Sequence, residues 1–241
     1  ERGIGLSTAV ETSIYYFMFN MLDDQVGGYT PEKRKLRQAI SIAFDTAEYI
    51  QIFMNGRGIE GDNPIPPGLF GHEPGQAGMN PTVFRWDAAK GDRVRRSLAE
   101  AKQLLTEAGY PEGRGPDGQP LTLSFDSAWF GSEYATRIDW VRKQLEKLGI
   151  VMKNNVTDLN RFQEKQDAGN WQLMPTGWYA DYPDPENFLF LVYGPNSIVP
   201  TKGQNTANYK SPRFDEPFHK LEAMENGPER LELIRKCRAA L

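Results

Sequence analysis

The sequence has little cysteine and histidine and no long apolar run, and each shortage argues against a class of protein. A single cysteine, Cys237, stands among 241 residues, so the chain can form neither an internal disulfide nor a cysteine-based metal site. The two histidines, His72 and His219, lack the HExxH spacing of zinc enzymes. No stretch approaches the roughly 18 apolar residues that can span a bilayer. We therefore expect no metal, no cofactor and no transmembrane helix.

Neither basic nor acidic residues are concentrated in one part of the chain. Lysine and arginine total 28 and aspartate and glutamate 32, for a formal net charge of −4, and the basic residues are scattered. Without a basic stripe, neither nucleic acid nor a membrane surface is an expected partner. The first residues, 1–4, show no basic-then-apolar pattern, so we expect no signal peptide within this chain.

The sequence does contain enough apolar residues for a full core, with 39% hydrophobic and 12% aromatic residues. Strand-like and helix-like segments alternate without an internal repeat, which predicts an α/β fold. The expected strands are residues 14–19, 121–125, 150–156 and 171–176. The expected helices are residues 31–44, 45–56, 92–108, 158–162, 185–193, 212–224 and 228–240, together with one that carries Ile138, Val141, Leu145 and Leu148 and stops at Gly149. Residues 14–19 are apolar on both faces, as in a central strand, although a short helix there stays open.

Residues that begin and end helices support these assignments. Thr30-Pro31 predicts a helix start, and Asp45 with Glu48 predicts a second one. Gly109 predicts a helix end. Residues 57–86 hold six glycines and five prolines, so we expect a long irregular connection there that wraps the surface.

Motifs of common enzymes are missing from the sequence. Ser7, Ser13 and Ser197 lack the GxSxG elbow, and no glycine-rich phosphate loop follows an expected strand. Asp181 and Asp184 could be a glycosidase pair, but such carboxylates usually come from separate elements. Asp184, in Asp-Pro-Glu, is better explained as a helix start or an internal salt bridge. A carbohydrate-active enzyme domain stays a minor alternative, which a hydrolysis screen tests.

The stretch GWYADYPDPENFLFLVYGPN, residues 177–196, places aromatic and acidic residues before an apolar run. A strand followed by a helix at Asp184 explains this order. In open α/β sheets, ligands bind beyond the carboxyl ends of strands, and residues 178–181 lie at such a place. Pro175 predicts an edge position or a break in this strand, because proline cannot donate a backbone hydrogen bond.

Five blocks of sequence carry a resemblance to a known family. They are LRQAISIAFD at 36–45, AKQLLTEAGYPEG at 101–113, KLGIVMK at 147–153, GWYADYPDPENF at 177–188 and NYKSPRFDE at 208–216. In this order and spacing they resemble the family 5 extracellular solute-binding proteins, the oligopeptide and dipeptide receptors of bacterial ABC importers. Family members are roughly twice as long and fold as two lobes around a cleft. The resemblance implies that residues 1–241 are the C-terminal lobe, a fragment with a periplasmic-binding-protein-like (type II) fold and a mixed sheet flanked by helices.

The resemblance also implies a ligand site. An aspartate in the family's A-D-Y motif, here Asp181, holds the ligand's α-ammonium group, and an aromatic residue, here Trp178, lines the cleft. Tyr179 is a further candidate contact, although strand alternation turns it to the other face. Some oligopeptide receptors have an arginine for the peptide carboxylate where this chain has Pro175. Two structural alternatives stay open: Asp181 as a cap or internal ion pair, and Trp178 as ordinary core.

Partners and location follow from the same resemblance. It implies a peptide or another small molecule as ligand, a membrane permease and the missing N-terminal lobe as protein partners, and no catalytic activity. The implied location is the periplasm, or the extracellular face through a lipid anchor. Because the family also includes receptors for oligosaccharides, opines, haem and metal chelates, the ligand class stays open between these and peptides.

Overall fold

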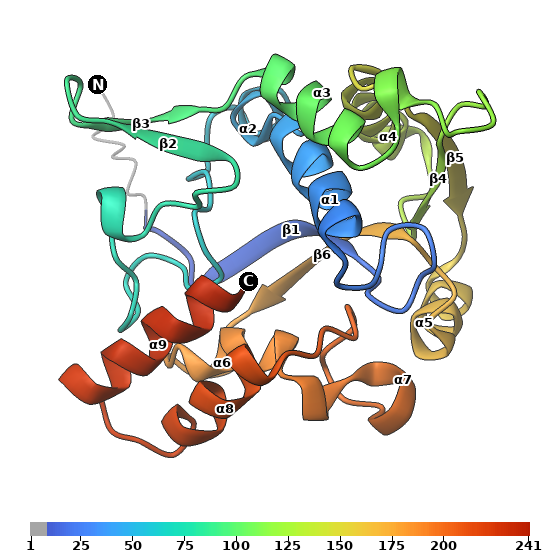
Figure 1. Cartoon of the computed structure of the whole chain (residues 1–241). Coiled ribbons are helices and arrows are strands. Elements are labelled where there is room, and N and C mark those ends of the chain that lie inside the picture. Colours follow the sequence, from blue (N-terminus) through green and yellow to red (C-terminus); the bar gives the residue numbers. More distant parts are fainter. Residues whose placement is uncertain (1–8) are drawn as a thin grey trace, which may run out of the picture.

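The computed structural model describes residues 9–241 as helices packed around a mixed sheet (Figure 1). The strands are β1 Ser13–Phe19, β2 Phe84–Asp87, β3 Asp92–Arg95, β4 Thr122–Ser127, β5 Val151–Val156 and β6 Leu173–Tyr179. The α-helices are α1 Pro31–Ala43, α2 Thr46–Phe53, α3 Leu98–Glu107, α4 Ser132–Glu146, α5 Leu159–Ala168, α6 Glu186–Leu189, α7 Ile198–Thr201, α8 Pro212–Leu221 and α9 Pro228–Ala240. The expected α/β class with a mixed sheet is confirmed.

The main sheet has four strands in the order β1-β6-β4-β5, and β2 and β3 form a separate hairpin. β4 pairs with β5 in parallel along its length, whereas β4 and β6 pair only at Phe125 and Leu173. β1 runs antiparallel to β6 over all seven residues. The paired β1 and β6 cross the middle of the molecule between two groups of helices (Figure 1).

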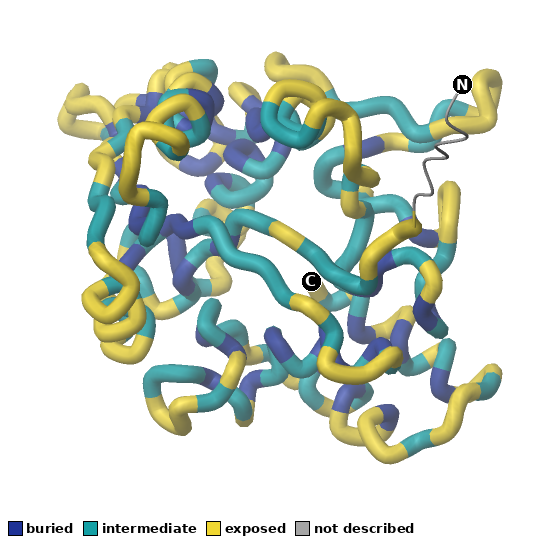
Figure 2. Tube along the Cα trace, turned by 180° about the vertical axis from the view of Figure 1, so that it is seen from behind, coloured by how far each residue is buried: buried dark blue, intermediate teal, exposed yellow. Residues whose placement is uncertain are grey.

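The expected strand at residues 14–19 exists, but its central position is wrong, because β1 lies at the edge of the sheet. Both faces of β1 are apolar because each face packs against a different hydrophobic core. Phe17 and Phe19 pack on one hydrophobic core, while Ile14, on the other face, packs on a second one. Seen from behind, the β1–β6 ribbon is half-buried or exposed over most of its length (Figure 2).

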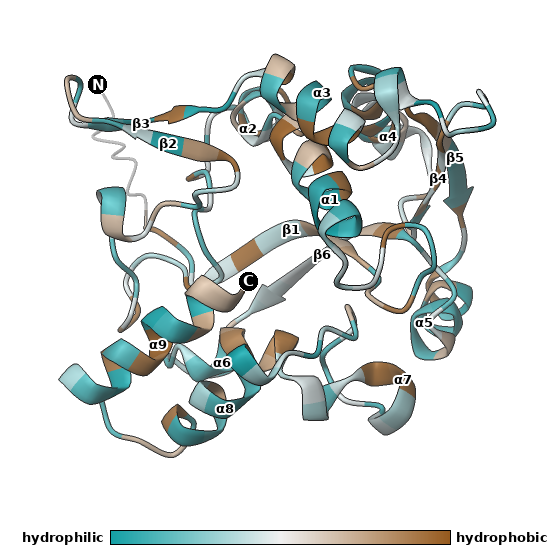
Figure 3. Ribbon diagram, viewed as in Figure 1, coloured by the Kyte–Doolittle hydropathy of each residue, from teal (hydrophilic) through white to brown (hydrophobic). Residues whose placement is uncertain are grey.

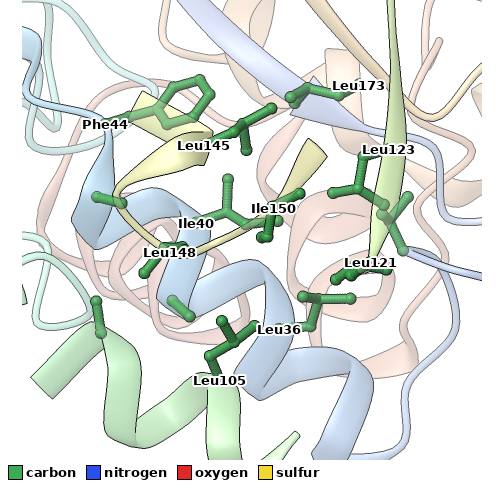
Figure 4. Close-up of a cluster of buried hydrophobic side chains, with 14 of the residues drawn as sticks. Leu36, Ile40, Phe44, Leu105, Leu121, Leu123, Leu145, Leu148, Ile150 and Leu173 are labelled. Atoms are coloured by element: carbon green, nitrogen blue, oxygen red, sulfur yellow. The ribbon is translucent and has the colours of Figure 1, made fainter. Parts of the chain in front are cut away.

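The first core lies between α1, α3, α4 and the strands β4 and β5. Thr30 caps α1 by accepting from the N–H of Lys33, and the apolar face spaced three and four residues apart turns inward. Figure 4 shows Leu36 and Ile40 of α1 among side chains of α3, α4 and β4. The helix expected at residues 31–44 is confirmed.

The second core joins α6, α8 and α9, whose surfaces alternate between hydrophobic and hydrophilic residues (Figure 3). Phe188, Phe214 and Ile234 are buried there. The long connection at residues 57–86 wraps onto this core through Ile65, and within it only residues 75–77 and the start of β2 are regular. The expected long irregular connection is therefore present, and its Ile65 side chain is buried in the second core.

The helix expected over residues 92–108 is wrong in its first part. Asp92–Arg95 is the strand β3, which pairs with β2. The helix begins only after Ser97, which forms a capping box with Glu100. The Arg93 guanidinium lies 4.3 Å above the centre of the Phe84 ring, which helps to hold the hairpin together. The strand forms because β2 supplies a partner, which local spacing does not reveal.

Two other elements extend further than expected. α5 continues to Ala168 rather than ending near Phe162, and it stops at Gly169, which has the left-handed φ of 69°. β6 continues to Tyr179 rather than ending at Thr176, since β1 pairs with it up to that residue. Trp178 and Tyr179 therefore lie within the strand.

Candidate ligand-binding site

Asp181 lies just beyond the end of β6, and Asn187 of α6 holds its backbone in place. The Asp181 N–H donates to Asn187 Oδ1 at 2.9 Å, and Asn187 Nδ2 donates to Asp181 Oδ2 at 3.3 Å. Asn187 is only 1% exposed, whereas Asp181 is exposed. Within residues 9–241, no salt bridge involves Asp181. The strand tip thus presents a positioned carboxylate without a cation from the described chain.

Asp184 has a structural role instead. It accepts from the Glu186 N–H at 2.8 Å at the start of α6 and receives two hydrogen bonds, of 2.7 and 2.8 Å, from the Arg230 guanidinium. Arg230 is 3% exposed. Burial raises the pKa of Asp184, but the bonds from Arg230 and Glu186 outweigh it, so the pKa is lowered overall. The expected helix-capping and ion-pairing role of Asp184 is confirmed.

Trp178 is half-buried and belongs to both a core and a cavity wall. Its indole Nε1–H donates to Asn187 Oδ1 at 3.1 Å, and its ring meets Phe190 edge-on at 5.3 Å between ring centres. It also lines a cavity of about 440 Å³. Asn187 Oδ1 therefore accepts hydrogen bonds from both Trp178 and Asp181, so the two candidate residues lie side by side.

The cavity beside Trp178 is mainly polar. The side chains of Gln163, Gln166 and Asp167 line it from α5, and Tyr16 lines it from β1. Burial raises the pKa of Tyr16 to about 12, so its hydroxyl stays a neutral donor at physiological pH. Amide and hydroxyl groups around an aromatic wall suit a polar side chain of a ligand.

Tyr179 lies on the opposite face of β6 from Trp178, as strand alternation predicts. It is exposed, its hydroxyl is hydrogen-bonded to that of Tyr15, and the two rings meet edge-on at 5.8 Å. Burial, together with this hydrogen bond, raises the pKa of Tyr15 to about 12. A Cβ on Gly177 would lie 2.6 Å from the Tyr15 ring, so this position needs glycine. Tyr179 thus belongs to a separate aromatic surface.

The backbone of β6 leaves one edge open next to these residues. The Ala180 N–H donates to Thr12 O at 2.9 Å, and at the other end Asn20 N–H donates to Gln172 O at 3.0 Å. Because backbone bonds in an antiparallel pair alternate, the even-numbered residues of β6 bond to β1. The N–H and C=O groups of Gly177 and Tyr179 therefore point to the other side, where pairing with β4 ends at Leu173.

Pro175 explains why this edge is open. It faces Phe17 in a position without hydrogen bonds to β1, so its missing N–H belongs to the β4 side. The next bond of the β4–β6 ladder after Leu173 would need that N–H. β6 lies between β1 and β4, where a proline would normally break a hydrogen bond. β6 tolerates Pro175 because β4 no longer pairs with it at this position. The expected local edge is confirmed.

Sequence reasoning did not foresee the cavity-lining residues Tyr16, Gln163, Gln166 and Asp167. It also missed two residues that contact the candidate residues directly. Asn187 has a visible signal, because a lone amide inside the apolar run NFLFLV must find hydrogen-bond partners once buried. Tyr15 has none. It meets Tyr179 across a separation of 164 residues, and only the register between β1 and β6 brings them together.

We expect Asn187→Ala to lower the free energy of unfolding by about 1–3 kcal/mol, because the indole N–H of Trp178 loses its acceptor. Urea denaturation followed by tryptophan fluorescence measures this change. Asn170→Ala is the control, since Asn170 is exposed and should cost less than about 0.5 kcal/mol. Equal stability of the two variants would show that the Asn187 bonds contribute nothing.

Comparisons with known proteins match this fold and sequence. The sequence profile of the bacterial extracellular solute-binding proteins, family 5 Middle, matches residues 2–199. The periplasmic oligopeptide-binding protein OppA of Salmonella typhimurium is 26% identical over 209 residues, covering 86% of this chain and 34% of that protein. Heme-binding protein A of Haemophilus influenzae is 26% identical over 207 residues, covering 84% of this chain and 33% of that protein.

Solved structures show the same fold. The periplasmic binding protein DppA of Helicobacter pylori, in complex with the peptide STSA, superposes with a TM-score of 0.74 at 22% identity, over 95% of this chain and 39% of that one. HbpA2 of Haemophilus parasuis gives a TM-score of 0.76 at 19% identity, over 95% of this chain and 40% of that one.

The chain belongs to the bacterial extracellular solute-binding proteins, family 5. The resemblance seen in the five sequence blocks is thereby confirmed. The chain spans about a third of the length of the curated relatives it matches. Among residues 9–241, no helix has the length and apolar character needed to cross a membrane, and no cluster of three or more potential metal ligands occurs.

Proposed function

We propose that this chain is the C-terminal lobe of a two-lobed periplasmic receptor that binds peptides and delivers them to the permease of an ABC importer. The observation that carries the proposal is the Asp181 carboxylate, which has no cationic partner within residues 9–241 and lies at the end of an open strand edge. Family membership supports solute binding without catalysis. The permease and the N-terminal lobe are the protein partners that the proposal requires.

The site supplies the groups that a peptide needs. A free α-ammonium group pairs with Asp181, and a charge-assisted bond of this kind is strong once a second lobe excludes water. The open edge of β6 offers N–H and C=O groups at Gly177 and Tyr179 to an extended backbone, which binds by adding a strand. The polar cavity beside Trp178 receives a ligand side chain.

Titration of the full-length receptor with a short peptide and its N-acetylated twin tests this proposal. Acetylation removes the ammonium charge and leaves the backbone bonds, so we expect affinity to fall roughly 30-fold or more. Isothermal calorimetry measures both constants. Equal affinities for the two peptides would refute the ammonium site.

A non-peptide solute of the same family is the second candidate. It is favoured by the similarity to heme-binding protein A and by the exposed aromatic pair Tyr15 and Tyr179, which offers flat apolar contact. Native mass spectrometry of the mildly purified full-length receptor distinguishes the candidates by the mass of a retained ligand. A retained peptide supports the first candidate, and a retained haem or sugar supports the second.

A further inference from the structure

We propose that Pro175 limits the length of peptide that the receptor binds by strand pairing, so that three residues are held fully and further residues add little affinity. The inference rests on the proposed peptide-binding function. The open edge of β6 offers a ligand its backbone donors and acceptors in a fixed order, from Tyr179 through Gly177 to Pro175.

The direction of the ligand follows from where the open edge lies. The ammonium group binds at Asp181, beyond the carboxyl end of β6, and the open edge extends from there back toward Leu173. The ligand therefore runs antiparallel to β6. Its first residue lies opposite Tyr179, its third opposite Gly177 and its fifth opposite Pro175.

These three positions do not offer the same hydrogen bonds. The backbones of Tyr179, Gly177 and Pro175 all face the open edge, since the alternate residues bond to β1. A facing pair in an antiparallel ladder exchanges two hydrogen bonds. Tyr179 and Gly177 have both an N–H and a C=O for this exchange, whereas Pro175 has only a C=O. The fifth ligand residue therefore forms half a pair.

The position of the ligand's carboxylate makes the difference larger. The C-terminal carboxylate of a tripeptide lies opposite the N–H of Gly177, and a hydrogen bond to a charged group is about twice as strong as a neutral one. The carboxylate of a pentapeptide lies opposite Pro175 and finds no N–H there. Beyond that point β4 occupies the edge through the pair of Phe125 with Leu173, so the ladder cannot continue.

Gly177 makes the two-bond position possible. A side chain there would contact the Tyr15 ring and come within 2.9 Å of the Ile14 carbonyl oxygen on the neighbouring strand. Glycine keeps β6 close to β1 and leaves its own N–H and C=O in line with the edge. In the sequence Pro-Thr-Gly at 175–177, Gly177 therefore supplies the last backbone N–H that a ligand can reach. Pro175, two residues earlier in the chain, has no N–H and ends the ladder.

A length series of alanine peptides, from two to five residues, tests the inference on the full-length receptor by calorimetry. We expect affinity to rise about tenfold from dipeptide to tripeptide and to change less than about threefold from tripeptide to pentapeptide. Amidation of the C-terminus should weaken the tripeptide about tenfold and leave the pentapeptide nearly unchanged. This comparison needs no variant of the protein.

Pro175→Ala restores the missing N–H and gives the complementary test. Because β4 has already left the edge of β6 after Leu173, the restored N–H is free for the ligand. Pentapeptide affinity should rise roughly fivefold to tenfold while tripeptide affinity stays the same. Weaker binding of peptides of every length would show that β4 pairs with the restored N–H instead. Pro183→Ala, in the exposed turn after β6, is the matched control and should change neither. A pentapeptide that binds wild type tenfold better than the tripeptide, or a Pro175→Ala effect equal for all lengths, overturns this inference alone. If no free-amine peptide binds, the proposed function fails and the inference fails with it.

Discussion

Asp184→Asn should lower the free energy of unfolding by about 3 kcal/mol, because it leaves the buried Arg230 guanidinium without its counter-charge. Loss of a helix-capping bond alone would cost only about 1 kcal/mol. Arg230 also donates to Leu221 O and Asn226 Oδ1, but neither acceptor carries a charge. The pair connects the start of α6 with α9, so the second core should loosen first.

Urea denaturation of wild type, Asp184→Asn and the double variant Asp184→Asn/Arg230→Met measures this effect. The double variant should recover part of the loss, since it no longer buries a lone charge. Asp181→Asn is the control, with a change below about 0.5 kcal/mol, because Asp181 is exposed. If Asp184→Asn is as stable as wild type, the hydrogen bonds of Arg230 to Leu221 and Asn226 are sufficient to stabilise its buried charge.

The stability of the pair should also depend on pH. The pKa of Asp184 is lowered in the folded state, so the stabilisation is complete above the unfolded pKa of about 3.9 and is lost as pH falls through the folded value. Wild type should therefore lose more stability in acid than Asp184→Asn does. Parallel pH profiles of the two proteins would contradict this assignment.

Asp181→Asn in the full-length receptor should weaken binding of a free-amine peptide by about 2–5 kcal/mol, or roughly 30-fold to several-thousand-fold. Asparagine keeps the shape of aspartate and its bond from Asn187, but removes the charge that balances a desolvated ammonium group. The effect therefore appears in affinity and not in stability.

Calorimetric titration of wild type and Asp181→Asn with the free-amine peptide and its N-acetylated twin measures this loss. The acetylated peptide should bind both proteins alike. Asp24→Asn is the matched control, because Asp24 is an exposed carboxylate beyond Phe19, whereas the site adjoins the other end of β1 at Ser13. Unchanged affinity of Asp181→Asn for the free-amine peptide would rule out the ammonium role.

Local patterns in the sequence predicted those features whose causes lie within a few residues. The helix after Thr30-Pro31 forms where expected, since its cap and its apolar spacing are both local. The same holds for Asp184 at the start of α6. The strand that leads to Asp181 was also expected, but pairing with β1 extends it three residues beyond its expected end at Thr176. The five ordered blocks also identified the family.

Residue patterns alone were enough to predict the α/β class, most helix starts and the segment that carries the candidate site. They could not predict that β1 lies at the edge, that Asp92–Arg95 pairs with β2, or that Arg230 meets Asp184. Strand register and buried ion pairs depend on contacts between segments that are far apart in the sequence. Caps and helix periodicity act over one or two turns, whereas the open edge of β6 exists only because Pro175, β1 and β4 meet in one sheet.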